Sequence, residues 1–162
     1  MGLTYNTAKS LLRQIVGYQG FTSSTTYLAL SSTKPTQCPA TPTSQTYADY
    51  NITEPSESSY ARVALVIGNQ TQYFNTDPTA TEDPETGKWT FTIANDREIH
   101  FPECTDATGW NQGHDIKYFA IFTTGTKGQG APIYVGEIET AIQVTENTVP
   151  LIRVGNLSIS VE

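Results

Sequence analysis

The sequence predicts a mainly β protein: an antiparallel β-sandwich of the jelly-roll-like type, with one short helix near the N-terminus. Short apolar stretches, about seven to nine of them, are separated by turn signals at the spacing typical of a sandwich, and no strand-helix-strand alternation occurs. Charged residues make up only 15% of the chain, and Thr, Ser, Asn, Gln and Tyr fill much of the rest, which favours strands over helices. The 162 residues suit a single domain, 1–162.

One helix is predicted within residues 1–20, because apolar residues recur there at the spacing of a helix face. These residues are Ala8, Leu11, Leu12, Ile15 and Val16. The same stretch carries Lys9 and Arg13, and the first 34 residues contain no acid. We interpret Lys9 and Arg13 as contacts to a partner protein, and the alternative is a pair of solvated surface cations.

A long irregular loop is predicted over residues 33–59. Its sequence is rich in Thr, Ser and Gln and is interrupted by Pro35, Pro39, Pro42 and Pro55. Loops of this length are usually functional or bound by a partner. Because Tyr47 and Tyr50 are its large apolar side chains, we expect them to anchor a contact with another protein chain.

The remaining apolar stretches are predicted to be strands. The stretch "YARVALVI" (60–67) is largely apolar on both faces, as a central strand would be. In "WTFTIA", Trp89, Phe91 and Ile93 share one face, which indicates that Trp89 is in the core. The chain then turns and returns through "EIHF". Further strands are expected in "TTYLALSS", "IKYFAIF", "APIYVGEI", "IQV", "PLIRV" and "LSISV".

Several function classes are disfavoured by composition. The net charge of −7 disfavours non-specific binding of nucleic acid, which needs clustered Lys and Arg. No apolar run approaches the roughly 18 residues of a membrane span, and no signal peptide is evident, so we expect a cytoplasmic origin without a membrane partner. Cys38 and Cys104 are expected to be free thiols. The glycines of "GTKGQG" precede a strand, which favours a hairpin over a phosphate-binding loop.

Candidate metal sites are weak. His100, Cys104, Asp106 and His114 lie close in the sequence and offer the N, S and O ligands of zinc, but His100 also fits an outward strand residue between two inward apolar neighbours. An acidic loop has oxygen ligands of the kind calcium binds, without the spacing of an EF-hand. We therefore expect no metal and no cofactor. The acidic residues of that loop are Asp77, Glu82, Asp83 and Glu85.

Candidate catalytic and sugar-binding residues are also few. Glu137 and Glu139 share a strand face at about 7 Å, within reach of a glycosidase pair, but carboxylates on a strand usually face solvent. No nucleophile lies beside a plausible base, so we expect no enzyme. The alternative function is a carbohydrate-binding module with Trp110, the freer of the two tryptophans, and Tyr118 as its aromatic platform.

A family resemblance emerges from the order of the segments. They are "YLALSSTKP", "EPSESSYARVAL", "IHFPECTDATGW", "IKYFAIF", "PIYVGEI" and "NLSISVE", of which "YARV" and "FPECTDATGW" are the most specific. This order resembles small virion proteins of tailed bacteriophages, of the tail fibre or head decoration type. The chain departs from their pattern at "SSTKP", at Lys117 and Tyr118, and in its longer acidic loop near Asp77.

The resemblance implies a non-enzymatic structural protein of the virion, assembled in the host cytoplasm. It implies partners among the capsid or tail proteins and a homo-oligomer, for which we favour a trimer. A capsid decoration or head fibre role is placed slightly ahead of a tail fibre role, and host-receptor binding is an alternative.

Overall fold

The computed structural model describes residues 15, 25–36, 46–67, 70–71 and 73–161. Antiparallel strands dominate this part of the chain, and its helical residues form 3-10 turns with no α-helix of seven or more residues among them. The helix predicted within residues 1–20 lies outside the described residues, apart from Ile15. The described residues also contain no helix long and apolar enough to cross a membrane. The elements are β1 (Tyr27–Ser31), η1 (Tyr47–Tyr50), β2 (Val63–Ala64), β3 (Val66–Ile67), β4 (Gln70–Thr71), β5 (Thr79–Glu82), β6 (Trp89–Ala94), β7 (Ile99–His100), η2 (Trp110–Gly113), β8 (Ile116–Phe122), β9 (Pro132–Ile142), β10 (Leu151–Ile152) and β11 (Ser158–Val161).

The largest sheet has four strands in the order β2-β1-β8-β9, all antiparallel. Side chains of successive strand residues point to opposite faces, and both faces of β1 and β8 are buried. Leu28, Leu30, Phe119 and Ile121 face the main core. The opposite face carries Ala29, Ala120 and Phe122, and η1 with the residues that follow it covers this face. This double burial explains why β8 is apolar at nearly every position.

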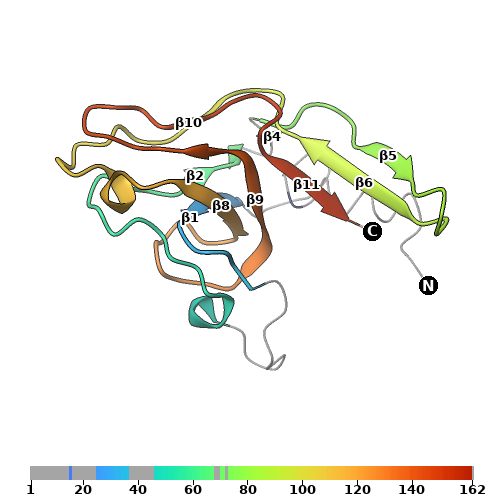
Figure 1. The fold of residues 1–162 in the computed structure, drawn as a ribbon, viewed down its shortest axis with the longest axis horizontal. Coiled ribbons are helices and arrows are strands. Elements are labelled where there is room, and N and C mark those ends of the chain that lie inside the picture. Colours follow the sequence, from blue (N-terminus) through green and yellow to red (C-terminus); the bar gives the residue numbers. More distant parts are fainter. Residues whose placement is uncertain (1–14, 16–24, 37–45, 68–69, 72, 162) are drawn as a thin grey trace.

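A second sheet has three strands in the order β11-β6-β5, and β7 and β10 form a separate antiparallel pair. Figure 1 shows β5, β6 and β11 on one side of the molecule and the four-stranded sheet on the other, with β9 running between them. The hydroxyl of Tyr134 in β9 accepts a hydrogen bond from the Ser160 N–H of β11 at 3.1 Å. Phe91 and Ile93 of β6 and Ile159 of β11 join Phe119 and Leu28 in one core.

Three sequence expectations need correction. The stretch 60–67 is not a central strand: it is broken at Leu65 into β2 and β3, and β2 lies at the edge of its sheet. β6 and β7 do not form a hairpin with each other, because β6 pairs with β5 and β11 while β7 pairs with β10. Trp89 is not a core residue, since 47% of its surface is exposed. The predictions of β1, β6, β8, β9 and β11 are confirmed.

Candidate functional site

The residues of the "YARV" motif form a buried charged cluster with Glu54. Arg62 holds this carboxylate with two hydrogen bonds, from Nε to Oε2 at 3.0 Å and from Nη2 to Oε1 at 2.7 Å. The side chains of Arg62 and Glu54 are 0% and 2% exposed. The Tyr60 hydroxyl donates to the same carboxylate at 3.0 Å and accepts the Leu30 N–H of β1 at 3.0 Å. A bidentate, fully hydrogen-bonded ion pair of this kind satisfies charges that would otherwise be costly to bury.

The same cluster fixes the turn between β8 and β9. Arg62 Nη1 donates to the carbonyls of Thr124 and Gln129 at 2.8 and 3.1 Å, and the Gly128 N–H donates to Glu54. The glycine-rich stretch is therefore a hairpin turn, as predicted, and it directs a backbone N–H at a protein carboxylate. We call the set Glu54, Tyr60, Arg62 and the turn 123–131 the charged lock.

Two further contacts strengthen the charged lock. The Arg62 guanidinium lies over the ring of Phe122, 3.7 Å from its centroid, which is a cation-π geometry. From the turn, Lys127 Nζ reaches back to the carbonyls of Pro55, Ser56 and Glu57 at 3.1 to 3.3 Å. Burial, followed by the negative charge of Glu54, raises the pKa of Tyr60 well above its usual value, so the hydroxyl remains protonated and can donate.

The second motif, "FPECTDATGW", packs against the charged lock through Trp110. The indole is 0% exposed, and its N–H donates to the Ser59 hydroxyl at 2.8 Å. Its ring meets Tyr60 edge to face, with centroids 5.1 Å apart. Ser59 in turn donates to Asp106, and this hydrogen bond lowers the pKa of the carboxyl. The two segments most specific to the resemblance therefore meet in space where Trp110 contacts Ser59 and Tyr60.

This burial overturns one candidate of the sequence analysis. Trp110 is not the freer tryptophan and offers no exposed face for a sugar. Tyr118 is half-buried and lines a small pocket of about 170 Å³ with Lys34, Pro35 and Glu137. The sequence predicts a buried Trp89 and a freer Trp110, and the structure shows the reverse, because periodicity gives a residue's face but does not show where the core ends.

The candidate zinc ligands are not brought together. The His100 side chain points outward and lies 3.4 Å from Glu98, which confirms its assignment as an outward strand residue. Cys104 is a free thiol and is fully buried, while His114 is exposed near η2. Cys38 lies outside the described residues. Among those residues, no three His, Cys, Asp or Glu side chains form a group that could hold a metal ion.

The carboxylate pair Glu137 and Glu139 is exposed on β9, and Glu137 is already paired with Lys117 at 2.6 Å. Two exposed carboxylates, one of them already held by a lysine, are not the arrangement of a glycosidase acid and base, which flank an enclosed sugar ring.

Of the four residues predicted to contact a partner, two lie outside the described residues and two lie within them. Lys9 and Arg13 lie outside the described residues. Tyr50 is buried, with 7% of its surface exposed, and belongs to the cluster that covers the four-stranded sheet. Tyr47 stacks on Phe122, with ring centroids 6.1 Å apart, and its hydroxyl accepts the Glu54 N–H. Both tyrosines thus have extensive contacts inside their own chain.

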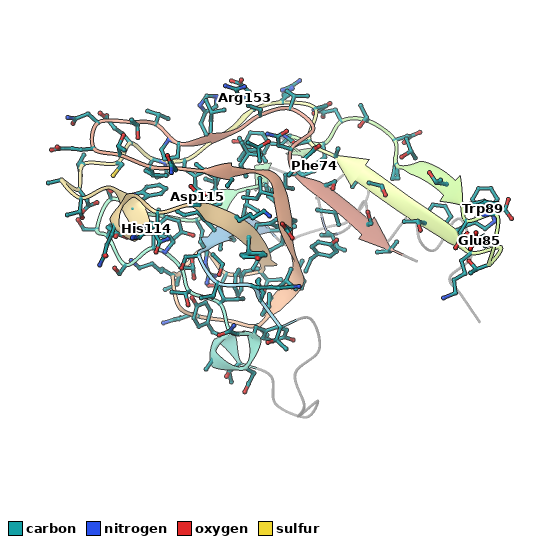
Figure 2. The ribbon with its side chains drawn as sticks, viewed as in Figure 1. Phe74, Glu85, Trp89, His114, Asp115 and Arg153 are labelled. Carbon is teal, nitrogen blue, oxygen red and sulfur yellow. The ribbon has the colours of Figure 1, made fainter. Side chains whose placement is uncertain are left out.

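Sequence reasoning missed the exposed apolar surface. Among the described residues, the large hydrophobic side chains with most exposure are Trp89 (47%), Ile133 (45%), Val149 (49%) and Val154 (57%). Val149 and Arg153 line a groove of about 590 Å³ between the end of β9 and β10. Figure 2 shows Trp89 and Glu85 together at one end of the molecule and Arg153 on a separate part of it. The turn "DPETGK" before Trp89 was the available signal, because a residue beside a polar turn often lies beyond the core.

The positions of the motif residues indicate the class of protein. The charged and aromatic motif residues Tyr60, Arg62 and Trp110 are buried and hold the interior together. Motif residues that serve the interior are what a structural protein requires. The family described as podophage GP4 fiber I protein gp80 matches residues 2–160, and the chain belongs to this family of phage fibre proteins. It is a non-enzymatic structural component of the virion. A search of curated proteins found no match.

Proposed function

We propose that the chain is the subunit of a homo-oligomeric fibre, with three copies favoured, that is assembled in the host cytoplasm and attached to the particle by other virion proteins. A head position is placed slightly ahead of a tail position. The observation that supports assembly is the exposure of the large hydrophobic side chains Trp89, Val149 and Val154 on a body in which the motif residues Tyr60, Arg62 and Trp110 are buried. Multi-angle light scattering of the purified full chain tests the copy number: a mass of three subunits is expected, and a monomer at micromolar concentration contradicts the proposal.

The fold supports a finer description of the subunit. The four-stranded sheet and the β11-β6-β5 sheet share one apolar core, and we propose that they are the two layers of a single jelly-roll-like sandwich over residues 1–162. Limited proteolysis followed by mass spectrometry tests this. One protected core that includes both β1 and β11 is expected, and two separable fragments would contradict it.

Attachment to the particle is assigned to Lys9 and Arg13. They are cations in a first segment that contains no acid, whereas the whole chain carries −7, so they suit an acidic partner surface. The double variant Lys9→Glu/Arg13→Glu should fold normally and be lost from purified particles. Normal incorporation would rule these two residues out as the attachment contact.

A second candidate function is binding of a host carbohydrate at Tyr118. The favouring observation is a half-exposed aromatic ring beside the Glu137 carboxylate and Lys34, in a pocket of about 170 Å³. A glycan array with wild type and Tyr118→Ala tests it. Binding that disappears in the variant supports a receptor role, and no binding by the wild type contradicts it.

A further inference from the structure

The small pocket beside Tyr118 lies on the outer face of the four-stranded sheet. Tyr118 of β8 and Glu137 of β9 are cross-strand partners, so their side chains leave the same face of the sheet. By strand alternation this is also the face of Ala120 and Phe122, which the η1 segment covers. The pocket has a volume of about 170 Å³ and is lined by Lys34, Pro35, Tyr118, Val135, Gly136 and Glu137.

The wall that Lys34 contributes is held in place by hydrogen bonds to η1 and the residue after it. The Asn51 side-chain amide donates to the Lys34 carbonyl at 3.1 Å, and the Thr36 N–H donates to the Tyr50 carbonyl at 2.8 Å. On the other side of Lys34, the Thr33 hydroxyl donates to the Asn51 carbonyl at 2.7 Å. A pocket whose walls are fixed before a ligand arrives loses less conformational freedom on binding.

The charges at the pocket do not cancel. Glu137 is the one carboxylate in its lining, and it lies 2.6 Å from the Lys117 ammonium, so these two charges neutralise each other. Lys34 is exposed and has no ion pair within the described part of the chain. The pocket therefore carries one uncompensated positive charge, although the net charge of the chain is −7. An anionic group of a ligand is attracted to this position.

The size and the side chains of the pocket limit what it can hold. Drug-sized ligands occupy pockets of roughly 300–1,000 Å³, so this smaller pocket suits a ligand the size of a single sugar ring. The partly exposed ring of Tyr118 provides an apolar surface for the C–H face of a sugar. The Glu137 carboxylate accepts hydrogen bonds from hydroxyl groups, whereas the Lys34 ammonium only donates and suits a carboxylate.

We propose that this pocket binds the terminal acidic residue of a glycan, that is, a sugar ring that carries a carboxylate. The carboxylate pairs with Lys34, one face of the ring packs on Tyr118, and ring hydroxyls donate to Glu137. The inference rests on the carbohydrate-binding function proposed above for Tyr118 and adds the class of sugar. An acidic side chain of a partner protein would use Lys34 alone, whereas a sugar acid also uses the aromatic ring and the carboxylate of the pocket.

The exposure of Lys34 has a consequence for the salt dependence of binding. Attraction between exposed charges is screened by salt, whereas the packing of a sugar face on an aromatic ring is not. The preference for an acidic sugar over its neutral counterpart should therefore shrink as the salt concentration rises, while the affinity for the neutral sugar stays nearly constant.

The test uses the full chain on an array of oligosaccharides arranged in pairs, each pair ending in the acidic or the neutral form of one sugar, such as glucuronic acid and glucose or galacturonic acid and galactose. The acidic member should bind about tenfold more tightly than the neutral one. Lys34→Gln should abolish this preference with circular dichroism unchanged, and Lys34→Arg should retain it. Lys88→Gln is the matched control, because it removes an exposed lysine of the β5–β6 turn and should leave the preference intact.

The outcomes separate this inference from the function on which it rests. Absence of binding to every glycan overturns both. Equal binding of the acidic and neutral members, with binding lost in Tyr118→Ala, overturns the class of sugar and leaves the carbohydrate-binding function standing. A preference for acidic sugars that survives Lys34→Gln overturns the assignment of Lys34. Binding of a poly-glutamate peptide through Lys34 without binding of any glycan identifies a protein ligand and also overturns the inference.

Discussion

Two β-hairpins of this protein have similar turns in the sequence and opposite environments in the structure. The turn between β8 and β9 is "TTGTKGQGA", and the turn between β5 and β6 is "DPETGK"; both are polar and contain lysine and glycine. In the first, Arg62 and Glu54 hold the backbone at three points. In the second, every residue is exposed and the hydrogen bonds are local. The role of a turn is set here by a distant partner rather than by its own residues.

The different contacts of the two hairpins suggest different roles, one in folding and one in assembly. The first hairpin is tied to a motif about 60 residues earlier in the sequence, and its polar groups are satisfied inside the protein. The second places carboxylates and an indole in solvent, where they contribute little to folding and are available to a partner. Changes at the first hairpin should therefore affect the free energy of unfolding, whereas changes at the second should affect association.

The largest effect is expected from Arg62→Met. The variant removes the cation and leaves the Glu54 carboxylate buried without its partner, and breaking such a pair costs about 3–5 kcal/mol of unfolding free energy. Urea denaturation followed by circular dichroism measures it. Lys117→Met is the matched control, because its ion pair with Glu137 is half exposed and screened by solvent, so its loss should have a much smaller effect. Equal losses in the two variants would show that the charged lock is not a stabilising unit.

The next effect concerns the segment that packs on the charged lock. Gly109 has a φ of +73°, and a Cβ there would clash with the Val144 carbonyl oxygen. Gly109→Ala therefore adds a backbone clash to left-handed strain and should cost roughly 2–4 kcal/mol. Gly87→Ala in the turn between β5 and β6 is the control: its φ is +66° with no atom within 4 Å, and its cost should be about 1 kcal/mol. Thermal unfolding of both variants tests the contrast, which fails if they are equally stable.

The strands themselves could be predicted from the sequence because burial leaves a local pattern. β6 has alternating apolar residues and β8 is apolar throughout, and both were located correctly. His100 was assigned outward for the same reason. For Trp89 the predicted strand face is correct and the predicted burial is wrong, because the alternation of apolar residues continues past the point where the core ends.

The charged lock could not be predicted, because nothing local distinguishes a buried arginine from a solvated one. Arginine side chains are exposed in most proteins unless they are paired. The interior position of Arg62 depends on Glu54, on Phe122 and on two carbonyls beyond residue 120. The same holds for the contacts that Tyr47 and Tyr50 make within their own chain. Their pocket is the outer face of β1 and β8, which exists only once the sheet has formed.

A smaller effect, dependent on pH, is expected from Tyr60→Phe. The variant leaves the buried Leu30 N–H without its acceptor and should cost about 1–3 kcal/mol near neutral pH. The folded protein raises the pKa of Tyr60, while the unfolded chain ionises near pH 10, so above that pH the unfolded state holds fewer protons than the folded state. The stability that Tyr60 provides is present below about pH 10 and is lost as pH rises further. Denaturation curves at pH 8 and at pH 10.5 should therefore show a smaller gap between wild type and variant at the higher pH.

The smallest effect on folding is expected from Trp89→Ala, which completes the contrast between the two hairpins. The indole is 47% exposed and lies beyond the core, so its removal from the monomer should change the unfolding free energy by less than about 0.5 kcal/mol. The measurement is best made at a concentration low enough to dissociate any oligomer, because binding to a second copy would add stability by mass action. Trp110→Ala is the control, since removing a fully buried indole costs about 3–5 kcal/mol. Fluorescence checks the same point independently: acrylamide should quench Trp89 in the Trp110→Phe variant strongly and Trp110 in the Trp89→Phe variant weakly. If Trp89→Ala instead destabilises the dilute monomer by as much as Trp110→Ala, the indole is covered within its own chain and the outer end of the β5–β6 hairpin belongs to the fold rather than to assembly.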